Sequence, residues 1–143
     1  PSLDDADAVA RWIEALRTLV PDCARHQVRL AIETGLTGAE TLQVLGQVDS
    51  PWIGDYFDVG NAAARGMDPA QEILTRRQHL AQIHVKGVRG APLAAGTVDL
   101  PSVARALRAI DYQGWVMLET ARGERPLAAI AAEREELLRH LAA

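Results

Sequence analysis

Four strand-like stretches of this chain end on side chains that can bind a metal ion or move a proton. The residues are Glu33, Asp58, His84 and Glu119, and each stands at or near the last position of its stretch. Three carboxylates and one imidazole form a mostly oxygen ligand set, which suits Mn²⁺ or Mg²⁺ better than a structural zinc ion. Because converging carboxylates repel one another without a cation, the pattern predicts one divalent-metal centre.

Such a centre supports acid–base chemistry on a carbonyl compound. A bound divalent ion polarises a carbonyl or hydroxyl group as a Lewis acid, and a carboxylate can then remove the neighbouring proton. Glu33 and Glu119 belong to the first and last stretches, so we expect them on opposite sides of a substrate. Lys86, Arg89 and Arg122 lie at or just beyond stretch ends and are candidates for contacting a substrate phosphate or hydroxyl group.

Each candidate also has an ordinary structural interpretation. Glu33 and Glu119 could cap the loops that follow their strands, and Asp58 could form an Asx turn. His84 could be a hydrogen-bonded polar residue inside the fold, and the basic residues could be solvated or ion-paired charges. The sequence alone leaves these alternatives open.

The elements that must position these residues alternate between helices and strands. Apolar periodicity and turn residues predict strands at 28–33, 52–58, 81–86 and 115–119, and helices at 3–20, after Thr37, after Asp68, at 101–110 and at 126–141. Ser2, Thr37 and Asp68 are the expected helix N-caps, and Pro21 is expected to end the first helix. Strands separated by helices imply parallel neighbours joined by right-handed crossovers.

The predicted strands have one apolar face and one mixed face. The inward row begins with Arg29, Tyr56, Gln82 and Met117 and narrows to the ionisable strand ends. A doubly wound sheet would be apolar on both faces. We therefore expect an α/β fold of the (β/α) TIM-barrel type, about half of an eight-stranded barrel with four parallel strands, with its chemistry at the carboxyl ends of the strands.

Composition places the chain among globular proteins. Its 143 residues suit one domain, 48% of them are hydrophobic, and no apolar run approaches a membrane-spanning length. A formal net charge of −4 argues against a nucleic-acid partner. Cys23 is the single cysteine, so a reducing cytoplasm is the expected location. Trp12, Trp52 and Trp115 are expected to pack within the protein.

Five motifs resemble the C-terminal half of the xylose-isomerase-like sugar isomerase and epimerase barrels. In chain order they are Leu30-Ala31-Ile32-Glu33, Phe57-Asp58-Val59-Gly60-Asn61, Ile83-His84-Val85-Lys86, Gly96-Thr97-Val98-Asp99 and Tyr112-Gln113-Gly114-Trp115-Val116-Met117-Leu118-Glu119. The resemblance covers roughly residues 28 to 120. The chain departs from the family pattern at Asn61, where many relatives have His, and at Gly87, where many have Asp.

The resemblance implies that Glu33, Asp58, His84 and Glu119 bind one Mn²⁺, Mg²⁺ or Co²⁺ ion. It further implies an isomerase or epimerase of a sugar or sugar derivative, in which the two glutamates move a proton through an enediolate. Asn61 stands where relatives have a residue that supports the metal or substrate. The alternatives are a metal-dependent dehydratase of a sugar-like substrate and a half-barrel without catalytic activity.

Four strands leave a barrel of this type half built. An eight-stranded barrel usually needs about 250 residues, and unpaired edge strands invite association with other chains. We therefore expect that residues before Pro1 supply an N-terminal half-barrel, or that a second copy of the chain does.

Overall fold

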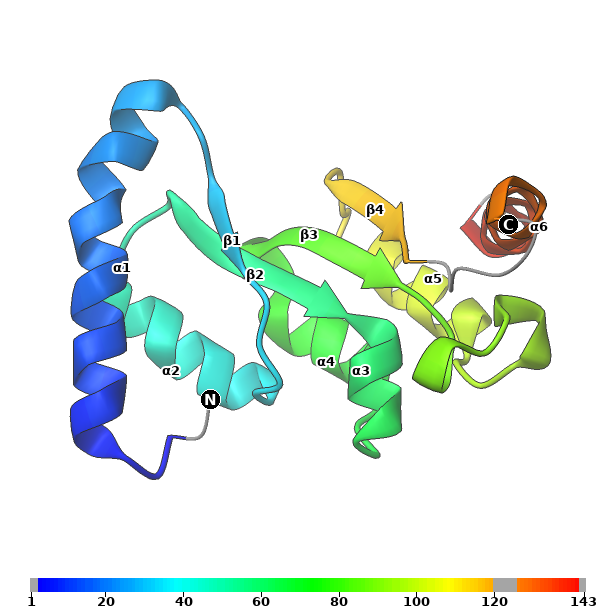
Figure 1. The fold of residues 1–143 in the computed structure, drawn as a ribbon, viewed down its shortest axis with the longest axis horizontal. Helices are drawn as coiled ribbons and strands as arrows, with labels where there is room; N and C mark the ends of the chain where they lie inside the picture. Colours follow the sequence, from blue (N-terminus) through cyan, green and yellow to red (C-terminus); the bar gives the residue numbers. More distant parts are fainter. Residues whose placement is uncertain (1–2, 120–125, 142–143) are drawn as a thin grey trace.

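Four parallel strands form one sheet in the order β1-β2-β3-β4 (Figure 1). The computed structural model describes residues 3–119 and 126–141. The strands are β1 (Leu30–Ile32), β2 (Ile53–Asp58), β3 (Leu80–Val85) and β4 (Trp115–Leu118). All three strand pairings are parallel, as the alternation of helices and strands predicted.

Helices cover one face of this sheet and stand beside both of its edges (Figure 1). They are α1 (Ala6–His26), α2 (Gly38–Val48), α3 (Val59–Ala64), α4 (Pro69–Arg76), α5 (Leu100–Ala109) and α6 (Pro126–Leu141), with short 3₁₀ turns η1 (Arg77–His79), η2 (Val88–Gly90) and η3 (Leu93–Ala95). Figure 1 shows α2 to α5 beneath the sheet, α1 beside the β1 edge and α6 beyond β4. In the described part of the chain, no helix is both long enough and apolar enough to cross a membrane.

Two predicted helix starts are confirmed by their cap geometry. The Thr37 hydroxyl accepts from the Glu40 N–H, and the Glu40 carboxylate accepts from the Thr37 N–H at 2.8 Å, which completes a capping box. The Asp68 carboxylate accepts from the Ala70 N–H at 2.9 Å, with proline at the next position. These caps fix where α2 and α4 begin beneath the sheet.

The first helix differs from the prediction. It starts at Ala6 with Asp5 as its N-cap, it contains Pro21, and it ends at His26; Ser2 lies outside the described residues. Proline inside a helix removes one backbone hydrogen bond and costs about 3 kcal/mol. Val20 and Cys23 pack against the cluster between α1, α2 and β1. This packing on both sides of Pro21 offsets the loss, so the helix continues.

The core lies between the sheet and the helices. Phe57, Ile83 and Val85 project from the helix-facing side of the central strands and are buried. They belong to a cluster that extends into α3, α4, α5 and α6, and a second cluster joins α1, α2 and the β1 side of the sheet. This face is the apolar one that the alternation of the sequence predicted.

The opposite face of the sheet carries the polar row. Asp58 lies beside His84, and His84 lies beside Met117, so these three side chains share one face. Figure 1 shows no described helix over this face. The prediction that Trp115 packs inside the protein is wrong, because its side chain is 78% exposed. It starts the edge strand β4 on the uncovered face, where no described element covers it.

Candidate metal centre

Three of the four predicted ligands converge at the carboxyl ends of β1, β2 and β3. Glu33, Asp58 and His84 each offer one ligand atom, and these atoms lie within 4.8 Å of one another. Glu119, just beyond β4, falls outside that group, yet its Oε2 is 3.6 Å from His84 Nδ1. The same nitrogen is 3.7 Å from Glu33 Oε2 and 4.0 Å from Asp58 Oδ2. Three carboxylates therefore surround one imidazole nitrogen.

Tyr56 orients the imidazole of His84 through the ring nitrogen that faces away from the carboxylates. The Tyr56 hydroxyl lies 2.6 Å from His84 Nε2, and the two rings are 4.2 Å apart between centroids. The hydroxyl also accepts from the Gln82 amide at 2.8 Å and donates to the Met117 sulfur at 3.4 Å. The Tyr56 contact engages Nε2, so Nδ1 is the ring nitrogen that faces the carboxylates.

Asp58 has two roles, one for each carboxylate oxygen. Oδ1 accepts from the Asn61 N–H at 2.8 Å and caps α3, so the Asx-type interpretation is part of the structure. Oδ2 faces the cluster and lies 2.8 Å from the Lys86 ammonium. The side chain is almost fully buried. One oxygen thus fixes the carboxylate while the other remains directed at the candidate centre.

Lys86 joins the acidic cluster as a cation. Its ammonium contacts Asp58 and donates to Glu119 Oε2 at 2.9 Å. Burial alone would lower the pKa of Lys86, but these hydrogen bonds and charges raise it. The hydrogen bond from Lys86 lowers the pKa of Glu119, which keeps that carboxylate ionised. Three carboxylates and one ammonium have a net charge of −2, which one divalent cation would neutralise.

The remaining predicted substrate residues differ in position. The Asn61 amide donates to Glu33 Oε1 at 3.4 Å, so it borders the cluster directly. Arg89 is exposed in η2 with a left-handed φ of 54°, and it makes no hydrogen bond to the cluster among the described residues. Arg122 lies outside the described residues.

A buried clamp holds the loop that carries Glu33. Arg76 of α4 donates to the Leu36 carbonyl at 2.8 Å and pairs with Glu72. Glu72 Oε2 also accepts from the Gly38 N–H at 2.6 Å. Side chains of α4 therefore form hydrogen bonds to both ends of the segment between residues 36 and 38. Neither this clamp nor the contact between Tyr56 and His84 was predicted from the sequence. The inward position of Tyr56 beside His84 was the available signal for the latter.

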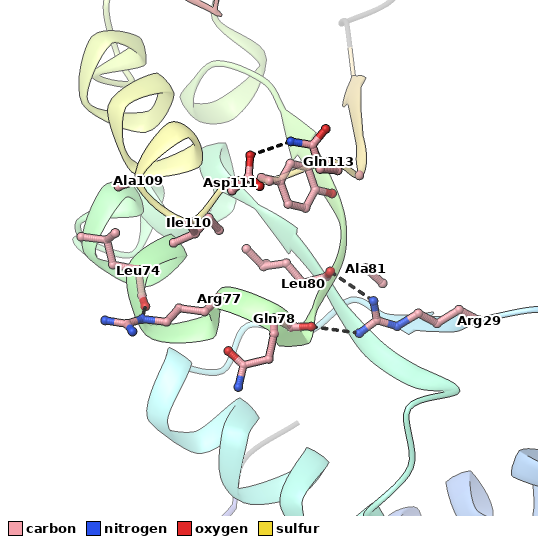
Figure 2. Close-up of a pocket in the computed structure, with 12 residues that line it drawn as sticks. Arg29, Leu74, Arg77, Gln78, Leu80, Ala81, Ala109, Ile110, Asp111 and Gln113 are labelled. Atoms are coloured by element: carbon pink, nitrogen blue, oxygen red, sulfur yellow. Dashed lines mark hydrogen bonds between the residues drawn. The ribbon is translucent and has the colours of Figure 1, made fainter.

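One large hollow of the protein lies apart from the cluster. It encloses about 830 Å³ and lies at the amino ends of the strands, lined by residues such as Arg29, Leu80 and Tyr112. Figure 2 shows Arg29 there, donating to the backbone carbonyls of Gln78 and Leu80. Barrel chemistry takes place at the carboxyl ends of the strands. The cluster, and not this hollow, lies at the carboxyl ends of the strands.

The donor set fits a divalent metal ion. His84 Nδ1 is buried and has no hydrogen-bond partner among the described residues, although its surroundings are strongly polar. Buried polar atoms are rarely left without a partner. A second-layer contact on Nε2, such as the Tyr56 hydroxyl, is typical of metal-binding histidines.

Comparison with known proteins places the chain in a family. Residues 1–142 match the family model described as xylose isomerase-like TIM barrel. The putative L-ribulose-5-phosphate 3-epimerase SgbU of Escherichia coli is 29% identical over 142 residues, which cover 87% of this chain and 50% of that protein. The chain thus spans about half the length of the curated relatives it matches.

Solved epimerase structures share the fold. D-allulose 3-epimerase from Methylomonas sp. matches 99% of this chain and 57% of its own with a TM-score of 0.81 and 19% identity. The 3-keto-D-glucoside 4-epimerase YcjR of Escherichia coli matches 100% of this chain and 57% of its own, with a TM-score of 0.80 and 22% identity. The predicted partial TIM barrel with four parallel strands is confirmed. The chain belongs to the xylose isomerase-like TIM-barrel family.

Proposed function

We propose that this chain carries the metal and acid–base half of a divalent-metal-dependent epimerase or isomerase of a sugar or sugar derivative. The observation that carries the proposal is the position of His84 Nδ1. It is buried, it lacks a hydrogen-bond partner among the described residues, and it faces the carboxylates of Glu33, Asp58 and Glu119 at 3.6 to 4.0 Å. This arrangement would bind a cation tightly and is costly without one.

Glu33, Asp58, His84 and Glu119 would hold the ion, with Mn²⁺, Mg²⁺ or Co²⁺ favoured over zinc by the three oxygen donors. When bound, the ion supplies Lewis-acid polarisation of a substrate carbonyl or hydroxyl group. Lys86 occupies part of the same space, because its ammonium bridges Asp58 and Glu119. We expect Lys86 to withdraw toward the substrate side when the ion enters and to donate there to a substrate oxygen.

Glu33 and Glu119 would act as the acid–base pair. They approach the imidazole of His84 from β1 and β4, the two outer strands of the sheet, so a substrate placed between them meets one carboxylate on each face. One carboxylate removes the proton next to the carbonyl group, and the other returns a proton on the opposite face, which inverts that carbon. The low pKa of Glu119 keeps it ready as a base near neutral pH.

The names of the relatives support an epimerase more directly than a dehydratase. The curated relatives include L-ribulose-5-phosphate 3-epimerases, which share 26% to 29% identity with this chain. Carbon 3 of such a ketose is next to the carbonyl group, where carboxylate-mediated proton transfer operates. We therefore place the reaction at the carbon next to a ketose carbonyl.

The proposal includes a second half-barrel, supplied by residues before Pro1 or by another copy of the chain. The face that carries the cluster is uncovered, with Trp115 and Met117 exposed on it. Partner strands on this face would close a pocket over Glu33 and Glu119. Sedimentation of the 143-residue chain tests the proposal: association is expected, and a stable monomer that unfolds cooperatively would contradict it.

The experiment is an NMR assay in D₂O with the whole protein loaded with Mn²⁺. Ketopentoses, ketohexoses and their phosphates are incubated, and we expect a C3 epimer that carries solvent deuterium at the inverted carbon. Loss of water from the substrate would support the dehydratase instead. Absence of both exchange and turnover would contradict the proposal. Arg11→Gln on the exposed side of α1 is a control that should leave turnover unchanged.

A further inference from the structure

A hollow of about 520 Å³ opens beside the Glu33 carboxylate. It is lined by Glu33, Thr34, Gly35, Asn61, Ala64 and Arg65, so it joins the loop after β1 to helix α3. Asn61 connects the hollow to the metal cluster through its hydrogen bond to Glu33. A substrate held at the cluster therefore has room to extend toward Arg65.

Arg65 is the positive charge of this hollow. Its guanidinium lies against Gly35 so closely that a Cβ on Gly35 would come within 2.5 Å of an Arg65 nitrogen. The guanidinium makes no hydrogen bond and no ion pair to any other described residue. Hydrogen bonds from Thr37 and, to a smaller extent, the charge of Arg65 lower the pKa of Glu40. The Glu40 carboxylate is hydrogen-bonded to Thr37. Arg65 thus keeps a planar set of donors available.

The charge balance of the cluster explains why such a donor matters. With a divalent ion, the three carboxylates and Lys86 reach neutrality, so the centre offers no surplus positive charge to an anionic substrate. A neutral centre does not attract a phosphate or carboxylate group, and the Glu33 carboxylate repels one that lies beside it unless a separate cation holds it. Arginine presents two parallel donors that match the oxygens of phosphate and carboxylate groups.

We propose that Arg65 binds a terminal anionic group of the substrate, a phosphate or a carboxylate, in the hollow beside Glu33. This inference rests on the proposed function and narrows it to a phosphorylated or acidic sugar. Gly35 lines the same hollow, and its N–H donates no hydrogen bond among the described residues.

Arg65 is a better candidate than Arg89 for this role. Arg65 shares its hollow with Glu33 and Asn61, which border the metal cluster. Arg89 follows β3 in an exposed turn, and it does not line that hollow. The two arginines therefore form a matched pair for an experiment in which only one substitution should matter.

The first test measures binding of inorganic phosphate to the whole protein by NMR titration. We expect saturable shifts of the Thr34, Gly35 and Arg65 signals. In Arg65→Gln the affinity should fall roughly 10- to 30-fold, the loss of a hydrogen bond to a charged group, while Arg89→Gln should bind as the unaltered chain does. Absence of saturable binding, or loss of binding in Arg89→Gln alone, would overturn the proposal.

The second test separates the inference from the proposed function. In the Mn²⁺-loaded whole protein, Arg65→Gln should raise KM for a ketose phosphate or a sugar acid, with kcat and the KM for a neutral ketose nearly unchanged. Comparing the phosphate and carboxylate substrates identifies which anion is used. Activity that is insensitive to Arg65→Gln overturns the inference alone. Phosphate binding at Arg65 without any turnover overturns the proposed function alone.

Discussion

Replacing Arg76 by methionine should break a buried ion pair in the core. Arg76 and Asp55 are each 2% exposed, and Arg76 Nε lies 2.6 Å from Asp55 Oδ2. The guanidinium also binds the Leu36 carbonyl and stacks over the Phe57 ring at 4.3 Å. Methionine keeps most of the apolar volume but leaves the Asp55 carboxylate buried without its partner.

The expected cost at about pH 7.5 is ~3–5 kcal/mol, the usual penalty for removing one partner of a buried ion pair. The penalty should shrink near pH 5, because an unpaired buried carboxylate can take up a proton and lose its charge. Replacing both partners, as Arg76→Met with Asp55→Leu, should recover much of the loss, since no buried charge remains.

Urea unfolding monitored by circular dichroism measures these changes as differences in the free energy of unfolding. Arg11→Met on the exposed face of α1 is the control and should change stability little. A cost below about 1 kcal/mol for Arg76→Met, equal at both pH values, would refute the reasoning, because that is the range of an exposed pair. A double variant no more stable than the single one would refute it as well.

Three further predictions concern the candidate centre and its support. Burial raises the pKa of Asp55 to about 6 from its usual 3.8, against the opposing charge of Arg76. Between about pH 7 and pH 4, Asp55 is therefore protonated in the folded chain at a higher pH than in the unfolded chain, so its contribution to the free energy of unfolding rises as pH falls. An NMR titration midpoint of the Asp55 carboxyl group near pH 4 would contradict this. Glu33→Gln and Glu119→Gln should each lower kcat of the whole protein by roughly 100-fold or more while the unfolding midpoint is kept, and near-normal turnover in either variant would reject its proton-transfer role. Tyr56→Phe should weaken Mn²⁺ binding by about 10- to 100-fold in a calorimetric titration; unchanged affinity would show that the hydroxyl does not orient the imidazole.

Alternation of side chains made the arrangement of the strand ends predictable. Asp58 and His84 stand at positions of the same parity in neighbouring parallel strands, so they had to reach one face. Local signals worked equally well at the helix starts, because the Thr37 capping box and the Asp68 cap act within a few residues. These features depend on chain neighbours or on a two-residue period, and both can be read from sequence.

Contacts between distant elements could not be predicted in this way. Asp55 and Arg76 are far apart in the chain, and an arginine near the end of a helix usually points into solvent. The register of the pairing between β2 and β3 shifts between Asp55 and Tyr56. Asp55 lies on the helix-facing side of the sheet, where Arg76 Nε contacts its carboxylate. The same limit applied to Pro21, whose helix continues because Val20 and Cys23 pack on a neighbouring cluster.

The most direct test of the metal centre is an anomalous X-ray map from crystals of the protein grown with Mn²⁺. We expect one strong peak per chain, between the side chains of Glu33, Asp58, His84 and Glu119, with His84 bound through Nδ1 and Lys86 displaced from Asp58. Absence of a peak there, a peak elsewhere, or coordination through His84 Nε2 would contradict it.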